Sequence, residues 1–544
     1  MVTGGDIALV NGRIWPHRPG DGVTAVRVRQ GVIAAVGSDG HALADRTSKT
    51  AVVDLRGRIV LPGFVDSHTH FHRFAVLRRH FLDLDDPSIT RIQDVVDAVA
   101  GRVADRPAGS WIEGDNLADG RLQERRLPTR HDLDRVSAQH PVLLRGVGKH
   151  LAVANSLALR LAGIDRATPD PAGGRIERDE DGEPTGVLHE RGKLRLDTTR
   201  VDTVVPPLDE SERLKALSDG LRGLHQRGVT SIHEITRTRT EFSDYKCLRE
   251  VDDLSVRVVS YVRVIEAQAT LDALTSVGFR SGYGDDWLRL GGVKVSIDGS
   301  CTFKNAAMYE PYPGDPGNTG IVRIEQAELD DVVRAADAAG LAVAVHAIGP
   351  RAVDMALDAF AKAARRNGPS SLRHRVEHAY VTPGRDRLAR MRQLGLLLST
   401  QPSFIWSVGD IWSGIFGAES AGGMVPLRTA IDVGLTVLAN SDCPTAPVDP
   451  LLAVASAVTR KTRGGQVLGG DETVTVAQAV DMQTTAPAFA IHQEDRVGRV
   501  AEGMLGDLVV LGADPRDTEP GEVPAIPVHA TVVGGRVVFE KELG

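Results

Sequence analysis

Eight apolar runs of strand length recur through the middle of this chain, and their spacing restricts the possible folds more than any other feature. Amphipathic stretches of helical character lie between most of them, for example residues 329–339 and 352–364. Strands that alternate with helices predict a parallel sheet covered by helices, and eight such units favour a closed but distorted (β/α)8 TIM barrel over an open sheet. The runs are residues 59–66, 229–234, 256–262, 290–297, 341–347, 374–378, 396–400 and 435–440.

Both ends of the chain show a different pattern, in which short apolar segments are joined by tight turns. Asn11-Gly12 and Gly534-Gly535 are typical of hairpin turns, and residues 26–36 alternate in polarity around Gly31. These segments predict a small β-sandwich made from the two termini. The expected domains are the β-sandwich at residues 1–58 plus 490–544 and the barrel at residues 59–489.

The connection between the first and second apolar runs is far longer than a loop between a strand and a helix should be. It also contains strand signals of its own, such as the apolar residues 141–144. We therefore expect an inserted α/β subdomain after the first barrel strand, at about residues 73–209.

The charge balance argues against several classes of partner. Among 544 residues, 64 Lys and Arg stand against 72 Asp and Glu, which gives a formal net charge of −8, and no dense basic run is present. A nucleic acid or an anionic membrane is therefore disfavoured as a partner. No apolar run could cross a bilayer, no export signal is recognisable, and three distant cysteines make no disulfide framework. We expect a cytoplasmic protein that acts on a small molecule.

Residues that can bind metal ions stand where the predicted strands end. His68 and His70 close the first run and are two residues apart, so their side chains lie on the same side of an extended chain. His346 and His378 close the fifth and sixth runs, and Asp442 follows the eighth. Barrel enzymes place their chemistry at the carboxyl ends of the strands. Imidazoles and a carboxylate from four such ends predict a site for zinc-like ions.

Lys294 lies within an apolar strand, where an unpaired ammonium group is costly. One interpretation pairs it with a barrel carboxylate such as Asp298 or Glu234, or lets its long side chain reach the rim of the barrel. The other is a lysine carboxylated by carbon dioxide, whose carbamate bridges two metal ions. The second interpretation also supplies an anionic ligand that four histidines and one aspartate lack for two metals.

The chain resembles the amidohydrolase superfamily, and within it the YtcJ-like, amidohydrolase-3 group that includes N-substituted formamide deformylase. The resemblance covers nearly the whole chain, and its motifs are highly specific as a set. They are residues 61–70 (LPGFVDSHTH), 174–176 with 181–190 (DGEPTGVLHE), 293–294 with 298–300, 345–349 (VHAIG), 373–378 (RHRVEH) and 441–442 with Pro444.

The resemblance implies a centre with two divalent ions, expected to be zinc, although manganese, iron or cobalt also suit such ligands. The implied ligands are His68, His70 and Asp442 for one ion, His346 and His378 for the other, and carboxylated Lys294 between them. Asp442 would also serve as the catalytic base and then acid. Relatives are often dimers, so a homodimer is expected.

Three residues outside this ligand set are candidates for contact with the substrate. Residues 301–306 read CTFKNA where relatives commonly read Leu-Gly-Ser-Arg-Thr-Ala, and this loop, which includes Lys304, should face the substrate. His150 belongs to a Gly-Lys-His sequence where Asp-Gly-His is more frequent. Trp111 could line the pocket, although His150 and Trp111 could equally belong to the core of the insert.

Hydrolysis of a carbon–nitrogen bond other than a peptide bond, in a linear amide or N-substituted formamide, is the leading expectation. A cyclic amidase or a deaminase of the same superfamily is the alternative, and the number of bound ions should separate the two. A non-catalytic scaffold is disfavoured, because all six ligand positions are filled.

Overall fold

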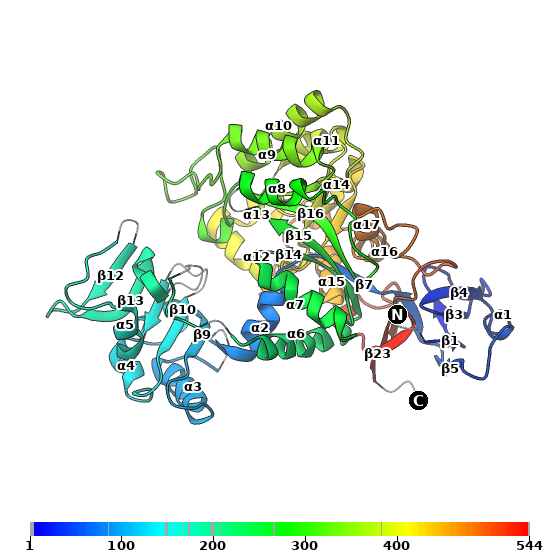
Figure 1. Cartoon of the computed structure of the whole chain (residues 1–544). Helices are drawn as coiled ribbons and strands as arrows, with labels where there is room; N and C mark the ends of the chain where they lie inside the picture. The colour runs from blue at the N-terminus through cyan, green and yellow to red at the C-terminus, as the bar shows by residue number, and fades with distance from the viewer. Residues whose placement is uncertain are drawn as a thin grey trace. The chain divides into compact units, whose positions relative to one another are not determined.

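The computed structural model contains one sheet of eight parallel strands, in the order in which they occur along the chain (Figure 1). The strands are β7 (Phe64–Thr69), β14 (Val229–Thr236), β15 (Arg257–Arg263), β16 (Leu288–Ser296), β17 (Ala342–Ala347), β18 (Arg375–His378), β19 (Leu397–Thr400) and β20 (Val437–Ala439). The first and last strands are joined where the Ser67 hydroxyl donates to the Ala439 carbonyl at 3.1 Å and the Asp442 amide donates to the His68 carbonyl at 3.0 Å. The predicted barrel is therefore confirmed.

The structure describes residues 5–84, 86, 88–146, 151–171, 174–196, 202–206, 208–264, 267–381 and 383–541. Helices connect the barrel strands. They include α2 (Phe71–His80), α6 (Glu210–His225), α7 (Arg239–Glu250), α8 (Ala267–Ser276), α9 (Gln326–Ala338), α10 (Pro350–Asn367), α11 (Gly384–Gln393), α12 (Ser403–Phe416), α13 (Ala418–Gly422), α14 (Leu427–Asp432), α15 (Pro450–Thr459), α16 (Val476–Asp481) and α17 (Thr485–Ala490).

Helix α10 illustrates why these segments are helical. Its buried residues Val353, Ala356, Leu357 and Phe360 recur at intervals of three and four and form one apolar face. The helix includes residues 352–364, where the sequence pattern predicts it. Among the described residues, none of the helices combines the length and the apolar character that a membrane span requires.

The prediction that residues 59–66 form a single barrel strand is wrong. Residues Ile59–Pro62 form a separate strand, β6, which pairs with β21 (Leu508–Leu511) near the C-terminus, and the barrel strand β7 begins only at Phe64. The chain changes sheets at Gly63, where a Cβ atom would lie 2.2 Å from the Thr230 hydroxyl oxygen. Because both segments are completely buried, the apolar run continues across the junction and hides it.

Two smaller sheets form the predicted β-sandwich from both termini. The first has the order β4 (Val32–Gly37), β3 (Ala25–Arg29), β1 (Ile7–Val10), β5 (Ala51–Asp54), and the second has the order β2 (Arg13–Ile14), β6, β21, β22 (Val528–Val533), β23 (Arg536–Glu540). One apolar core contains Ile7 and Val26 from the first sheet and Val60, Leu508 and Val532 from the second. The short helix α1 (Asp39–Leu43) follows β4.

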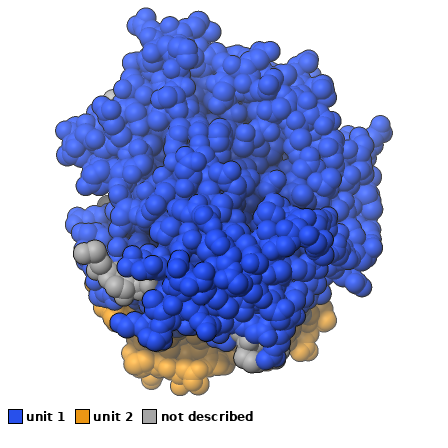
Figure 2. All heavy atoms as spheres, turned by 90° about the vertical axis from the view of Figure 1, so that its right-hand side faces the viewer, with its two compact units in different colours: residues 1–74, 217–544 blue, residues 75–216 orange. Residues whose placement is uncertain are grey.

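Residues 75–216 form a compact unit separate from residues 1–74 and 217–544 (Figure 2). Its mixed sheet has the order β12 (Gly174–Arg178), β13 (Pro184–Glu190), β11 (Leu151–Ala154), β10 (Val142–Gly146), β9 (Ile112–Leu117), β8 (Leu82–Asp83). The helices α3 (Ile92–Ala104), α4 (Arg130–Asp134) and α5 (Ser156–Ala162) accompany this sheet. The predicted divisions of the remaining chain at residues 58 and 490 stay predictions.

Candidate metal centre

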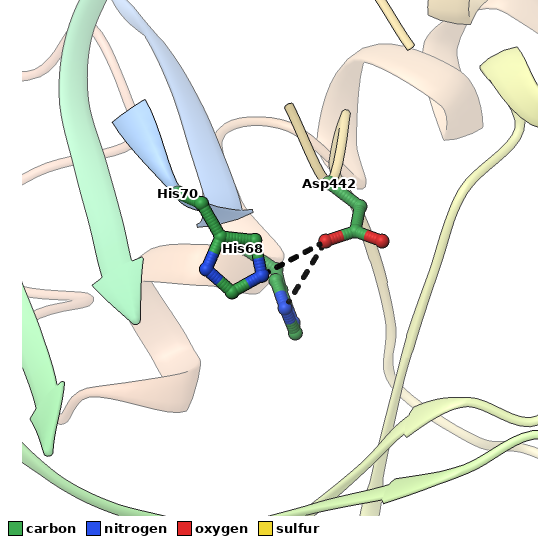
Figure 3. Close-up of side chains that lie close together, drawn as sticks. All are labelled: His68, His70 and Asp442. Atoms are coloured by element: carbon green, nitrogen blue, oxygen red, sulfur yellow. Dashed lines mark ion pairs between the residues drawn. The ribbon is translucent and has the colours of Figure 1, made fainter. Parts of the chain in front are cut away.

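Three side chains meet at the carboxyl ends of β7 and β20 (Figure 3). The Nε2 atoms of His68 and His70 lie 3.5 and 3.4 Å from the same oxygen, Oδ1 of Asp442. Atoms able to bind a metal, one from each residue, lie within 4.8 Å of one another. Two imidazoles and a carboxylate at this spacing are a suitable set of ligands for a divalent ion.

The backbone around Asp442 holds its carboxylate toward the histidines. Asp442 itself has φ of 48°, a left-handed conformation that aspartate tolerates better than most residues. The preceding residue, Ser441, is fixed by the Asp66 carboxylate, which accepts the Ser441 amide at 2.9 Å and the Ser441 hydroxyl at 2.5 Å. The loop after β20 is therefore tied to β7, the strand that carries His68 and is directly followed by His70.

His346 and His378 form a second pair directly beside the first group. Their ring centroids are 4.4 Å apart, and the ring of His378 lies 5.1 Å from that of His68. The His346 Nε2 atom is buried and makes no hydrogen bond among the described residues, and it lies 3.4 Å from Asp298 Oδ1. A buried imidazole nitrogen without a hydrogen bond, next to His378, fits the role of a metal ligand.

Two hydrogen bonds orient the ligand histidines. The Nδ1–H group of His68 donates to Glu377 Oε2 at 2.6 Å, and that of His378 donates to Gln401 Oε1 at 3.0 Å. The amide of Gln401 donates in turn to Asn440 Oδ1 at 2.8 Å. Because Nδ1 carries the proton in both rings, Nε2 is the free coordinating nitrogen, which is the usual arrangement at metal sites.

Burial favours the neutral form of the His68 and His378 imidazoles. Burial lowers the pKa of His378 to about 3, assisted by the neighbouring His346, and burial also lowers the pKa of His68 well below its usual value. Burial alone would raise the pKa of Asp442, but a hydrogen bond from His70 and the nearby His68 and His378 lower it overall. Neutral imidazoles and an ionised carboxylate are the forms that bind metals.

Lys294, on β16, is only 3% exposed and lies near the negative charges of Glu377 and Asp442. Burial lowers the pKa of its amine to about 8. The two carboxylates considered above as alternative partners are engaged elsewhere. Asp298 accepts three backbone amides, from Ala307, Ile348 and Gly349, and Glu234 accepts those of Phe71 and His72 together with the Tyr245 hydroxyl.

Arg375 and Glu377, which the sequence predictions did not single out, form a buried polar chain with His233. Arg375 Nε lies 2.5 Å from Glu377 Oε1, its Nη1 donates to His233 Nδ1 at 3.2 Å, and its guanidinium lies 4.0 Å from the centroid of the Tyr261 ring. Both Arg375 and Glu377 belong to the RVEH segment that carries His378. Their spacing of two, which puts their side chains on the same face of β18, is the only signal that could have revealed them.

The three predicted substrate contacts stay predictions. Trp111 is partly buried and packs against an apolar cluster within residues 75–216 that includes Leu143 and Ala152. Lys304 follows a short turn of helix, Cys301–Phe303, in a left-handed conformation and is partly exposed. His150 lies outside the described residues.

Comparisons with known proteins agree with this geometry. The chain is 30% identical over 540 residues to YtcJ of Bacillus subtilis, covering 96% of this chain and 97% of YtcJ. It is 28% identical to the N-substituted formamide deformylase of Arthrobacter pascens, covering 95% of each chain. The Arabidopsis thaliana protein LONG AFTER FAR-RED 3 is 31% identical over 98% of this chain and 91% of its own.

The solved structures of two uncharacterized metal-dependent hydrolases are also similar. The one from Pyrococcus horikoshii has a TM-score of 0.77 at 27% identity and covers 95% of this chain and 99% of its own. The one from Pyrococcus furiosus has a TM-score of 0.76 at 27% identity and covers 94% of this chain and 100% of its own. The family model described as "Amidohydrolase family" matches residues 51–539, and with these likenesses it shows that this chain belongs to the amidohydrolase family.

Proposed function

We propose that this chain is a metal-dependent amidohydrolase that cleaves a carbon–nitrogen bond, other than a peptide bond, in a small amide or N-substituted formamide. The convergence of His68, His70 and Asp442 within hydrogen-bonding reach, with His346 and His378 beside them, is the observation that carries this proposal. The similarity to N-substituted formamide deformylase favours the class of bond.

The ligand assignment follows the two groups of side chains. His68, His70 and Asp442 would hold one divalent ion, and His346 and His378 a second. Lys294 would lie between them as a carbamate, formed when its neutral amine adds to carbon dioxide and releases a proton. The lowered pKa of this buried amine favours the neutral form that reacts.

A bound divalent ion supplies a Lewis acid and makes a water molecule acidic enough to yield hydroxide near neutral pH. The protein then has to move one proton. Asp442 is ionised and lies beside both histidines, so it accepts the proton from the attacking water and returns it to the departing nitrogen. Glu377 and Gln401 keep the His68 and His378 rings in place meanwhile.

Metal content and turnover test the proposal together. Protein purified without chelators is expected to contain two divalent ions per chain and to hydrolyse members of a panel of formamides, acetamides and lactams. Replacement of His68 and His346 by Ala should lower the metal content, whereas replacement of His41, exposed on α1, should not. A fully folded protein that binds no divalent ion would exclude the proposed chemistry, and a single ion would favour a deaminase.

A further inference from the structure

Three arginines stand at the carboxyl ends of neighbouring barrel strands, close to the candidate metal centre. Arg237 directly follows β14, and Arg263 is the last residue of β15. Arg323 belongs to the segment after β16, where its amide donates to the Ile297 carbonyl at 2.7 Å. β14, β15 and β16 are adjacent in the barrel (Figure 1), so the three residues share one part of its rim.

Strand register directs two of these side chains toward the inside of the barrel. Arg263 is paired with Lys294 on β16, and paired residues of parallel strands present their side chains to the same face. Tyr261, two residues before Arg263, lies in the barrel interior under Arg375. Arg237 likewise stands two residues after Ile235, which packs with Tyr261 in an interior cluster.

These arginines have few compensating charges. Within the described residues, the side chains of Arg237, Arg263 and Arg323 make no ion pair with a carboxylate. Burial, together with the positive charges of Arg237 and Arg323, lowers the pKa of Arg263 to about 10, and Glu241 acts in the opposite direction. The Glu241 carboxylate also accepts the backbone amide of Arg237 at 2.5 Å.

Two almost completely buried arginines on the barrel strands are paired with carboxylates. Arg257 contacts Asp507 at 2.5 Å and Arg375 contacts Glu377 at the same distance. The unpaired group therefore stands out in a protein with a net charge of −8. Like charges held together at a site are costly unless a ligand of opposite charge binds there, and guanidinium groups are especially suited to carboxylates.

We propose that Arg263, with Arg237 and Arg323, binds a carboxylate group of the substrate, so that the amide hydrolysed at the metal centre is part of an acidic small molecule. This inference rests on the proposed function and narrows its substrate class. The arginines recognise the substrate in this scheme, and the metal ligands carry out the reaction.

Matched substrates test the inference. N-formylphenylalanine and N-acetylphenylalanine carry the carboxylate, and their C-terminal amides lack it while keeping the same reacting bond. The metal-loaded protein is expected to prefer the carboxylates. Arg263→Gln should lower kcat/KM for the carboxylates about 10- to 100-fold, as expected for loss of a charged hydrogen bond. The kcat/KM for the corresponding C-terminal amides should stay nearly unchanged. Equal losses on both kinds of substrate would overturn the inference.

A second test variant and a control variant complete this experiment. Arg323→Gln changes an exposed side chain and should give a smaller loss of the preference for carboxylates over amides. Because this change should not disturb folding, it tests the inference even if Arg263→Gln fails to fold. Arg334→Gln, on the outer helix α9, removes the same charge from a surface pair with Asp331 and should change nothing. If Arg263→Gln and Arg323→Gln both leave the preference for carboxylates over amides unchanged, the inference is contradicted.

Binding separates this inference from the proposed function. The metal-loaded Asp442→Asn protein should bind N-acetylphenylalanine at least about tenfold more tightly than its amide by calorimetry, and Arg263→Gln added to it should abolish the difference. Equal affinities for the two ligands would reject the carboxylate site even if every amide is hydrolysed. Failure to hydrolyse any amide, with the carboxylate preference intact, would reject the proposed function alone.

Discussion

In the proposed mechanism Asp442 has two roles, because its carboxylate would both hold a metal ion and transfer a proton. Replacement by Asn keeps a similar side-chain shape and tolerates the same left-handed backbone. It removes the basic oxygen, so kcat should fall by about 10²- to 10⁴-fold, the range typical of a lost general acid–base group. The measurement is steady-state turnover at metal saturation, with the bound metal determined in the same sample. Near-normal turnover with the metal retained would rule out the proton-transfer role.

Some residues of the candidate metal centre can be predicted from the sequence, and others cannot. His68 and His70 are predictable because a spacing of two puts both side chains on one side of a strand. The orienting residues give no such signal. Glu377 contacts His68 across 309 residues of sequence, and Gln401 contacts His378 from the next strand. Their role depends on which strands become neighbours inside the barrel, and local pattern does not encode that.

At the scale of the single element, helix α6 ends in a histidine that is buried without a charge. His225 is 1% exposed, and its ring contacts the Val229 carbonyl at 3.3 Å and the Ser255 hydroxyl at 2.8 Å. Burial lowers its pKa to about 4, so in the folded protein it stays neutral while the unfolded chain takes up a proton below about pH 6.5. Its contribution to stability is complete above pH 6.5 and is lost as the pH falls toward 4.

This residue therefore predicts a particular acid sensitivity. The free energy of unfolding should decrease by up to about 1.4 kcal/mol per pH unit between pH 6.5 and 4 because of His225 alone. His225→Gln keeps a polar side chain of similar reach and should reduce that slope, measured by urea unfolding at several pH values. The exposed His41→Gln is the control and should keep the wild-type slope. An identical slope in His225→Gln would contradict the assignment.

Element boundaries also show where sequence patterns fail. The runs that became β14, β17 and β19 lie within two residues of their predicted ends, because turns or helices interrupt the apolar pattern there. The junction between β6 and β7 was missed although the turn-type dipeptide Pro62-Gly63 marks it, because the apolar residues on both sides have the pattern of a single run. Its position depends on the pairing of β6 with β21, about 450 residues later in the chain, and on the close approach of Gly63 to Thr230.

At the scale of the whole molecule, a buried ion pair as well as apolar packing connects the terminal sandwich to the barrel. Arg257, the first residue of β15, contacts Asp507, just before β21, through two hydrogen bonds of 2.5 and 2.9 Å. Asp507 also accepts the amide of Gly534 at 2.8 Å, in the turn that joins β22 and β23. Both side chains of the ion pair are less than 8% exposed. Strand β15 and the turn between β22 and β23 thus share the buried carboxylate that precedes β21.

Loss of the arginine from this pair should destabilise the molecule strongly. Arg257→Met leaves Asp507 as an unpaired buried charge, which typically costs about 3–5 kcal/mol in the free energy of unfolding. The double variant Arg257→Met with Asp507→Leu should recover part of that loss, because an apolar pair removes the uncompensated charge. Arg536→Met is a matched control, since its contact with Asp252 also links β23 to the segment after α7 but is half exposed at 3.4 Å. It should change stability by less than about 1 kcal/mol. Equal effects of Arg257→Met and Arg536→Met in urea unfolding would show that the buried contact does not hold the sandwich to the barrel.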